Sequence, residues 1–206
     1  MLNFDIILIE NIYKEKKVVS YNKILGFPLL LIDEGRKSGI INEMVFDIEN
    51  GIVQGLINIG IGRKQNFIKL SDIKLLEDKA VIQDSGSMKA WDKRKKDNKR
   101  FIFGKELITK KVFDYNGNDL GYVCDLFMDF DTGYLEAFQL TDGIIEDIIE
   151  GRKIIPVFGK IVLKEEGLFV AKESIEEFVD VKKGIKQIFS TYEDVTNKNL
   201  QRSGLR

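Results

Sequence analysis

The chain has 206 residues, of which 44% are hydrophobic and 32% are charged, and its formal net charge is −1. This balance is typical of a globular protein, and it excludes a molecule that is basic over its whole surface and binds nucleic acid by that field. There is no histidine, which excludes His-based catalytic triads and His metal sites, and the single cysteine cannot form an internal disulfide. These features predict a protein that is not an enzyme and has no metal or cofactor.

Residues 1–19 are interpreted as an N-terminal extension. Their apolar run is short and is interrupted by Asp5 and Glu10, whereas a signal peptide has a basic start and a longer apolar region. Nowhere does the sequence approach the roughly 18 consecutive apolar residues of a membrane span. We therefore expect a cytoplasmic protein, in which Cys124 is reduced and buried as a small hydrophobic residue.

The chain contains an internal similarity. Residues 22–56 align with residues 104–138 without a gap when the sequence is shifted by 82 positions. The identical pairs are Lys23/Lys105, Leu25/Leu107, Gly35/Gly117, Gly39/Gly121, Asp47/Asp129 and Gly51/Gly133. Because the shared glycines fall where turns are needed, we interpret the match as a duplication.

Each copy is predicted to be a series of short strands that closes into a small barrel around its own separate core. Apolar and acidic residues alternate from residue 122 to residue 130, so Asp125 and Asp129 are expected to face outward. The segment 142–151 has apolar residues at helical spacing and is expected to form one or two helical turns. The strands are predicted at residues 27–32, 38–48, 52–61, 67–70 and 79–83, and at residues 110–116, 122–130, 134–140, 154–158 and 167–171.

A family resemblance rests on three stretches: residues 39–47 with Gly51, residues 121–129 with Gly133, and residues 151–156. This pattern resembles the PRC-barrel family, whose module occurs in the photosynthetic reaction-centre H subunit and in ribosome maturation factors, and it is similar to tandem PRC-barrel proteins of bacteria. The resemblance implies an all-β protein with two small PRC-type β-barrels in tandem. It also implies a binding or assembly module, and it supplies no catalytic residues.

The expected organisation has five parts. They are the extension 1–19, barrel 1 at 20–84, a basic linker at 85–102, barrel 2 at 103–173, and a C-terminal helical segment and tail at 174–206. The last part begins with the capping-box sequence Ser174-Ile-Glu-Glu177. Its amphipathic helices pack either on this chain or on a partner.

The linker supplies the candidate partner-binding residues. They are Trp91, Lys93, Arg94, Lys95, Lys96, Lys99 and Arg100. Such a run is either a solvated linker or a patch for acidic protein, RNA or anionic lipid, with Trp91 able to stack or insert. Residues 1–102 carry a net charge of +4 and residues 103–206 a net charge of −5, so the halves could also self-associate into a homo-oligomer.

Two functions from different classes follow from these features. The first is a non-catalytic scaffold that binds another protein through its barrel surfaces or its C-terminal helices. The alternative is an RNA- or ribosome-associated assembly factor, and contact with an anionic membrane surface is a weaker option. A metal or small-ligand enzyme would need the acidic residues between 125 and 150, which are interpreted instead as exposed strand and turn residues.

Overall fold

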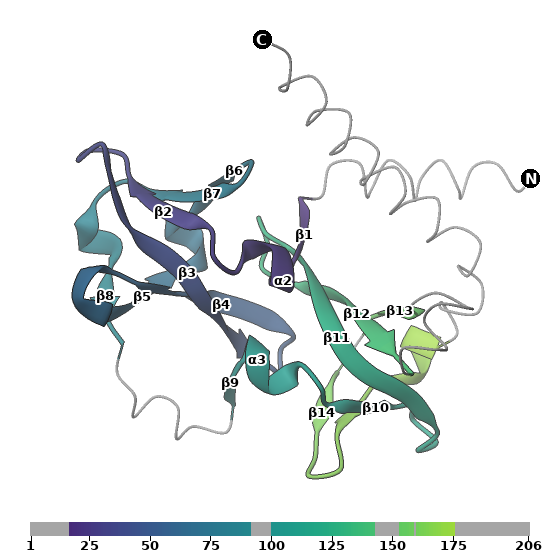
Figure 1. The fold of residues 1–206 in the computed structure, drawn as a ribbon. Helices are drawn as coiled ribbons and strands as arrows, with labels where there is room; N and C mark the ends of the chain where they lie inside the picture. Colours follow the sequence, from purple (N-terminus) through teal and green to yellow (C-terminus); the bar gives the residue numbers. More distant parts are fainter. Residues whose placement is uncertain (1–16, 92–99, 143–152, 159, 176–206) are drawn as a thin grey trace, which may run out of the picture.

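The computed structural model describes residues 17–91, 100–142, 153–158 and 160–175, and these form two β-sheets that lie side by side (Figure 1). The first sheet contains β2 (Pro28–Leu31), β3 (Arg36–Asp47), β4 (Ile52–Ile59), β5 (Gln65–Lys69), β6 (Lys74–Leu76), β7 (Lys79–Ile82), β8 (Lys89–Ala90) and β9 (Phe101–Phe103). The second contains β1 (Val18–Ser20), β10 (Lys111–Phe113), β11 (Asp119–Asp129), β12 (Leu135–Thr141), β13 (Lys153–Pro156), β14 (Val162–Leu163) and β15 (Leu168–Phe169). The helices whose bounds the structure gives are short: α2 (Tyr21–Ile24), α3 (Gly104–Leu107) and three 3₁₀ turns, Ile61–Arg63, Leu70–Asp72 and Ser85–Ser87.

The all-β class is confirmed, but the closed barrels predicted from the sequence are not found. The first sheet runs in the order β6-β7-β2-β3-β4-β5-β8, and the second in the order β13-β12-β11-β10-β15-β14. Within the described ranges the two ends of each path do not pair with one another. These end strands have only two to four residues, so they are too short to extend a ladder around the whole circumference.

The two sheets pair their long strands in matching registers. Met44 pairs with Leu56, and Leu126 pairs with Phe138, 82 positions later in both strands. Two β-bulges also coincide, since the register shifts between Ile41/Glu43 and Val45/Phe46 in β3 and between Val123/Asp125 and Phe127/Met128 in β11. The long strands predicted at 38–48 and 122–130 are therefore present as β3 and β11, and they share their irregularities as well as their hydrogen bonding.

The gapless alignment is wrong at its start by one residue. Leu29 pairs with Gly39, whereas Val112 pairs with Gly121, so the offset before the first hairpin is 83. The reason is that six residues separate Leu30 from its partner Lys37, and five separate the corresponding pair in the second sheet. The identities Lys23/Lys105 and Leu25/Leu107 are thus out of register, and the structurally matched helix residues are Ile24 and Leu107, which are both buried.

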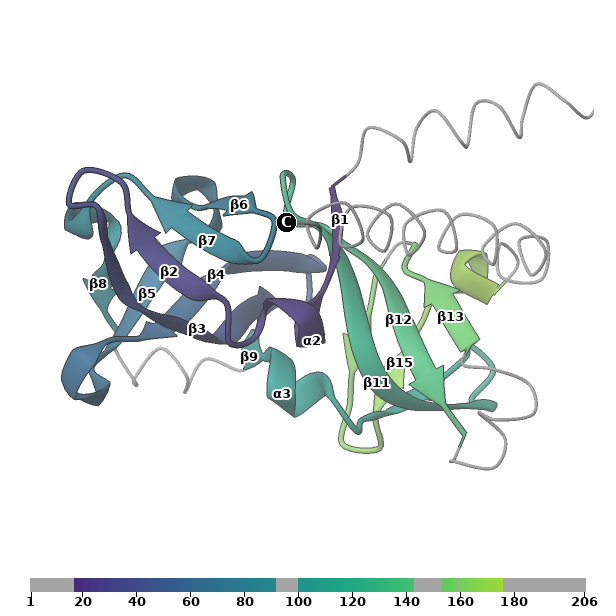
Figure 2. The same cartoon turned by 45° about the horizontal axis from the view of Figure 1, so that its top comes forward.

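Each half contributes a strand to the sheet of the other half (Figure 2). Strand β1, which precedes the first sheet in sequence, pairs with β11 of the second sheet, with Ser20 opposite Phe127. Strand β9 pairs with β3 of the first sheet, with Phe103 opposite Val45. Residues 85–102, predicted as a basic linker, contain β8 and the first two residues of β9.

The ends of the two long hairpins also bind each other reciprocally. The backbone N–H of Val53 donates to the Gly133 carbonyl, and that of Leu135 donates to the Gly51 carbonyl, both at 2.8 Å. The donor residues and the acceptor residues are each 82 positions apart, so the two bonds are equivalent. Between them Ile52 forms a bridge with Tyr134, its own equivalent.

The two halves share one continuous hydrophobic core, so the prediction of two separate cores is wrong. Buried apolar residues of both sheets belong to a single cluster. They include Tyr21, Phe46 and Leu56 from the first half and Leu126 and Phe138 from the second. The exchanged strands and the docked hairpin ends close the gap that two independent barrels would leave between them.

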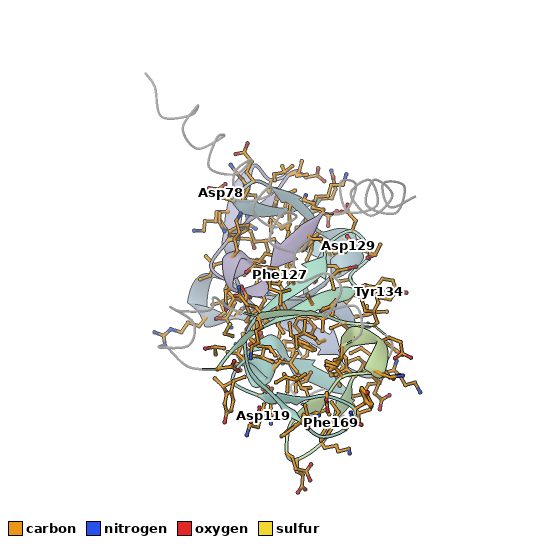
Figure 3. All side chains as sticks on the ribbon, turned by 90° about the vertical axis from the view of Figure 1, so that its right-hand side faces the viewer. Asp78, Asp119, Phe127, Asp129, Tyr134 and Phe169 are labelled. Carbon is orange, nitrogen blue, oxygen red and sulfur yellow. The ribbon has the colours of Figure 1, made fainter. Side chains whose placement is uncertain are left out.

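The acids of the second long strand are buried, contrary to the outward orientation expected from their alternation. Asp125 is 8% exposed and Asp129 is 4% exposed, and Phe127 and Asp129 lie along β11 in Figure 3. The bulge between Val123 and Asp125 shifts the alternation, and the exchanged elements β1 and α2 pack against this strand.

Three predictions concern other parts of the chain. Cys124 is half-buried rather than buried, and its thiol lies 3.7 Å from Gln139 Oε1. The helical turns expected at 142–151 and the helical segment expected at 174–206 lie almost wholly outside the described residues. In the part of the chain that is described, no helix is long and apolar enough to cross a membrane.

Candidate functional site

Trp91 lies in an aromatic cluster on the outer face of the first sheet. Its backbone N–H donates to the Gln65 carbonyl at 3.1 Å, which fixes the residue beside β5. The indole lies between Phe67 and Phe103, with ring centroids 5.8 Å and 5.7 Å away and the planes tilted by 42° and 48°. All three rings are half-buried, so they form a packed cluster with exposed edges rather than separate stacking platforms.

The position of Phe67 follows from strand geometry. Phe67 is opposite Ile57 on one side and Lys89 on the other. A Cβ atom added to Gly55 would lie 2.7 Å from the Phe67 ring, so the ring packs directly on the backbone of β4. Trp91, two residues after Lys89, then emerges on the same face.

Three lysines surround the aromatic cluster. Lys69 is two residues after Phe67 on β5, and Lys89 lies directly across from Phe67 on β8; both are exposed. The Lys105 ammonium lies 5.1 Å from the Phe103 ring centroid, and its side chain is 62% exposed. We call the six residues Phe67, Lys69, Lys89, Trp91, Phe103 and Lys105 the Trp91 surface. An apolar centre with a cationic border is suited to an anionic partner that also carries apolar groups.

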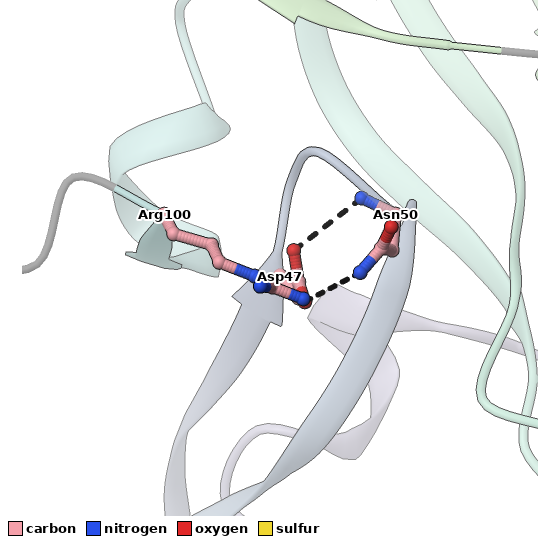
Figure 4. A network of polar contacts seen from close by, with 3 residues as sticks. All are labelled: Asp47, Asn50 and Arg100. Carbon is pink, nitrogen blue, oxygen red and sulfur yellow. Dashed lines mark hydrogen bonds and ion pairs between the residues drawn. The ribbon is translucent and has the colours of Figure 1, made fainter.

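Arg100 is the last residue of the basic run, and its guanidinium group forms an ion pair with the buried carboxylate of Asp47 (Figure 4). Its Nε and Nη2 atoms donate to Asp47 Oδ2 at 2.8 Å and 2.6 Å. Asn50 also donates to Asp47, through its backbone N–H at 3.3 Å and its side-chain amide at 2.9 Å. Burial alone would raise the pKa of Asp47, but the hydrogen bonds from Arg100 and Asn50 outweigh it and lower the pKa below its usual value.

The sequence identified only part of this surface. Of the predicted residues, Trp91 joins the cluster, Arg100 forms the ion pair with Asp47, and Lys93, Arg94, Lys95, Lys96 and Lys99 lie outside the described residues. The residues that the sequence did not indicate are Phe67, Phe103, Lys69, Lys89 and Lys105. Phe67 and Lys69 stand on either side of the buried Ile68, and this alternation signals a strand with one outward face. No local pattern shows, however, that β5, β8 and β9 meet.

The acidic residues considered for metal binding are separated by the fold. Asp125 is engaged at the junction of the halves, Glu136 lies on β12, and Asp142 forms an ion pair with Lys153. The other three, Glu146, Asp147 and Glu150, lie outside the described residues. Over the described ranges, no three metal-ligating side chains come together.

Two buried carboxylates lie where the short helices dock on the opposite sheet. Asp125 accepts hydrogen bonds from Ser20 Oγ at 2.5 Å and from the Asn22 N–H at 3.1 Å. The matched Glu43 accepts hydrogen bonds from the Tyr21 hydroxyl at 2.9 Å and from the Met44 N–H at 2.8 Å, and the Lys105 ammonium lies 4.0 Å from its other oxygen. Burial, reinforced by the Glu43 carboxylate, raises the pKa of the Tyr21 phenol, so the hydroxyl stays protonated as a donor. Both carboxylates are occupied by structural hydrogen bonds.

Comparison with known proteins gives a family match for the second half. A model of the PRC-barrel domain matches residues 99–185. This range includes β9 to β15, and residues 20–84 lie outside it. A search of curated proteins finds no match to the chain.

Proposed function

We propose that this chain is a non-catalytic scaffold protein that binds an acidic segment of a partner protein at the Trp91 surface. The single observation that carries the proposal is the Trp91 ring held between Phe67 and Phe103, with Lys69, Lys89 and Lys105 around it. Half-buried aromatic rings with a polar border are a common feature of protein interfaces. We place the protein in the cytoplasm on its composition alone.

We also propose that residues 17–91 are a second copy of the PRC-type fold. Support comes from the matched pairs Met44/Leu56 and Leu126/Phe138, and from the bulges at the same places in β3 and β11. A parallel pair in each half agrees as well, since β2 pairs with β7 and β10 pairs with β15. Two copies that present different side chains would give a scaffold two distinct faces.

RNA is the second candidate partner, favoured by the basic run Lys93–Arg100 that follows Trp91 in sequence. Such a partner would be held mainly by phosphate contacts, whose strength falls steeply with salt. A protein partner would depend more on burial of the aromatic cluster and less on salt.

The test is affinity capture of partners by the full chain, with and without nuclease. The double variant Lys69→Glu/Lys89→Glu reverses two exposed charges of the Trp91 surface, and Lys37→Glu/Lys74→Glu makes the same charge change elsewhere on the first sheet. We expect a nuclease-resistant protein that the first variant loses and the second retains. Equal capture by both variants would refute the surface, and capture abolished by nuclease would favour RNA.

A further inference from the structure

The outer face of the second sheet carries an apolar row that ends at the edge of the sheet. The row consists of Val162, Phe169 and Phe113, each directly opposite the next. Asp119 on β11 follows Phe113 and ends the apolar stretch, and Figure 3 labels Phe169 and Asp119. The Phe113 and Phe169 rings stack with centroids 5.0 Å apart. Val162, on the edge strand β14, is 46% exposed.

The matched row of the first sheet shows that the fold does not require these residues. There the same positions are occupied by Lys74, Val81, Leu30 and Lys37. The position of Val162 is thus a lysine in the other half, and the two phenylalanines correspond to aliphatic residues. Because the same backbone forms without the larger apolar row, the exposed Val162 and the half-buried Phe113 and Phe169 point to a contact outside the chain.

Strand β14 ends the path of its sheet, and among the described residues no strand pairs with its outer side. Exposed edges of this kind are templates for pairing with another chain. The charges along β14 are opposite at its two ends, because exposed Lys160 precedes the strand and exposed Glu165 and Glu166 follow it. Two antiparallel copies of this strand would place the lysine end of each against the glutamate end of the other.

We propose that a second copy of this chain binds here, so that the protein forms a two-fold dimer through antiparallel pairing of β14 and contact between the two apolar rows. Lys164, whose ammonium lies 4.2 Å from the Phe169 centroid, is in the turn beside the strand. This dimer leaves the Trp91 surface on the other sheet available, and it does not depend on the function proposed above. A dimer would present that surface twice.

Sedimentation velocity of the full chain over a range of concentrations tests the dimer. We expect a species of twice the 23.6 kDa chain mass. Val162→Lys should weaken association by about tenfold or more, because it places a charge in the apolar contact. Leu76→Lys, which puts the same charge on exposed edge strand β6 of the first sheet, is the control and should have no effect.

A charge exchange tests the antiparallel pairing itself. Lys160→Glu should weaken the dimer, and the double variant Lys160→Glu/Glu166→Lys should restore it, because the opposite charges meet again with their signs exchanged. A double variant that stays as weak as Lys160→Glu would refute the pairing. A wild-type chain that remains monomeric, or a dimer unaffected by Val162→Lys, would overturn the proposal. The apolar row would then have another binding partner, either residues 176–206 of the same chain or a different protein.

Discussion

The two halves of the molecule share their backbone pairing and differ where they meet. At the junction, Tyr21 and Gly104 occupy matched first positions of α2 and α3. A Cβ atom added to Gly104 would lie 2.2 Å from the Tyr21 ring, so only one of the two positions can hold a large side chain. The backbone registers are thus common to both halves, whereas the packing at the junction requires different residues in each.

The same contrast appears on the outer faces. The first sheet carries the Trp91 surface, and the second has Ser20 opposite Phe127 where the first has Phe103 opposite Val45. The second sheet instead carries the row that contains Phe113 and Phe169. A similar backbone therefore supports two unlike surfaces.

The largest loss of stability is expected where a side chain is added to a glycine whose backbone lies close to a neighbouring strand. Gly39 and Gly121 have φ angles of 146° and 117°, and an added Cβ would lie 2.1 Å from the Ile59 carbonyl oxygen in the first case. In the second case its nearest atom is the Asp142 side chain at 2.5 Å, which can move, and the nearest backbone atom is the Thr141 carbonyl oxygen, farther away at 2.9 Å. We expect Gly39→Ala to cost about 3 kcal/mol of unfolding free energy and Gly121→Ala clearly less. Equal losses in denaturant titrations would contradict this difference.

Removing one hydrogen-bond donor from each of the two buried carboxylates, Glu43 and Asp125, should lower the free energy of unfolding by different amounts. Tyr21→Phe removes a fully buried hydrogen bond and leaves Glu43 with the Met44 N–H and the Lys105 ammonium, and we expect it to cost about 2 kcal/mol. Ser20→Ala removes a partly exposed bond to Asp125 and the exposed cap to the Lys23 N–H, and it leaves Asp125 with the N–H groups of Asn22 and Leu126, so we expect a loss nearer to about 1 kcal/mol. Denaturant midpoints at pH 7 measure both, and a larger loss for Ser20→Ala would contradict the assignment.

The Asp47–Arg100 pair should make stability depend on acid. Because the folded pKa of Asp47 is lowered, its contribution is complete above the unfolded pKa and disappears as pH falls through the folded value. Arg100→Gln should therefore lower the melting temperature at pH 7 and have a smaller effect in acid below pH ~4. The control is Lys17→Gln, since the Lys17 ammonium donates to the Leu75 carbonyl, which does not titrate. A temperature difference that is constant with pH would contradict the account.

The smallest effect is expected at a strained turn. Thr109 follows α3 with φ = 72°, and the matched residue of the first half, Gly26, has φ = 87°. A β-branched residue is strained in this region. Thr109→Gly should therefore stabilise the protein by about 0.5 kcal/mol, since relief of strain slightly exceeds the added chain entropy of glycine. A loss of stability would show that the Thr109 backbone is not strained.

The local features of this fold could be predicted from the sequence, and the contacts between halves could not. The turn glycines and the alternation in β3 and β11 located the long strands, because those signals act between near neighbours. The burial of Asp125 depends on Ser20 and Asn22 from the other end of the chain, and the cluster around Trp91 depends on Phe67 and Phe103. No pattern within a single segment contains that information.

The central claim is that the halves form one body by exchanging β1 and β9 and sharing a core. Inserting a protease site between residues 95 and 96 and cutting the purified full-length protein tests it most directly. We predict that the two fragments remain associated in gel filtration and unfold in a single transition. Fragments that separate without denaturant, or that melt at two distinct temperatures, would contradict it.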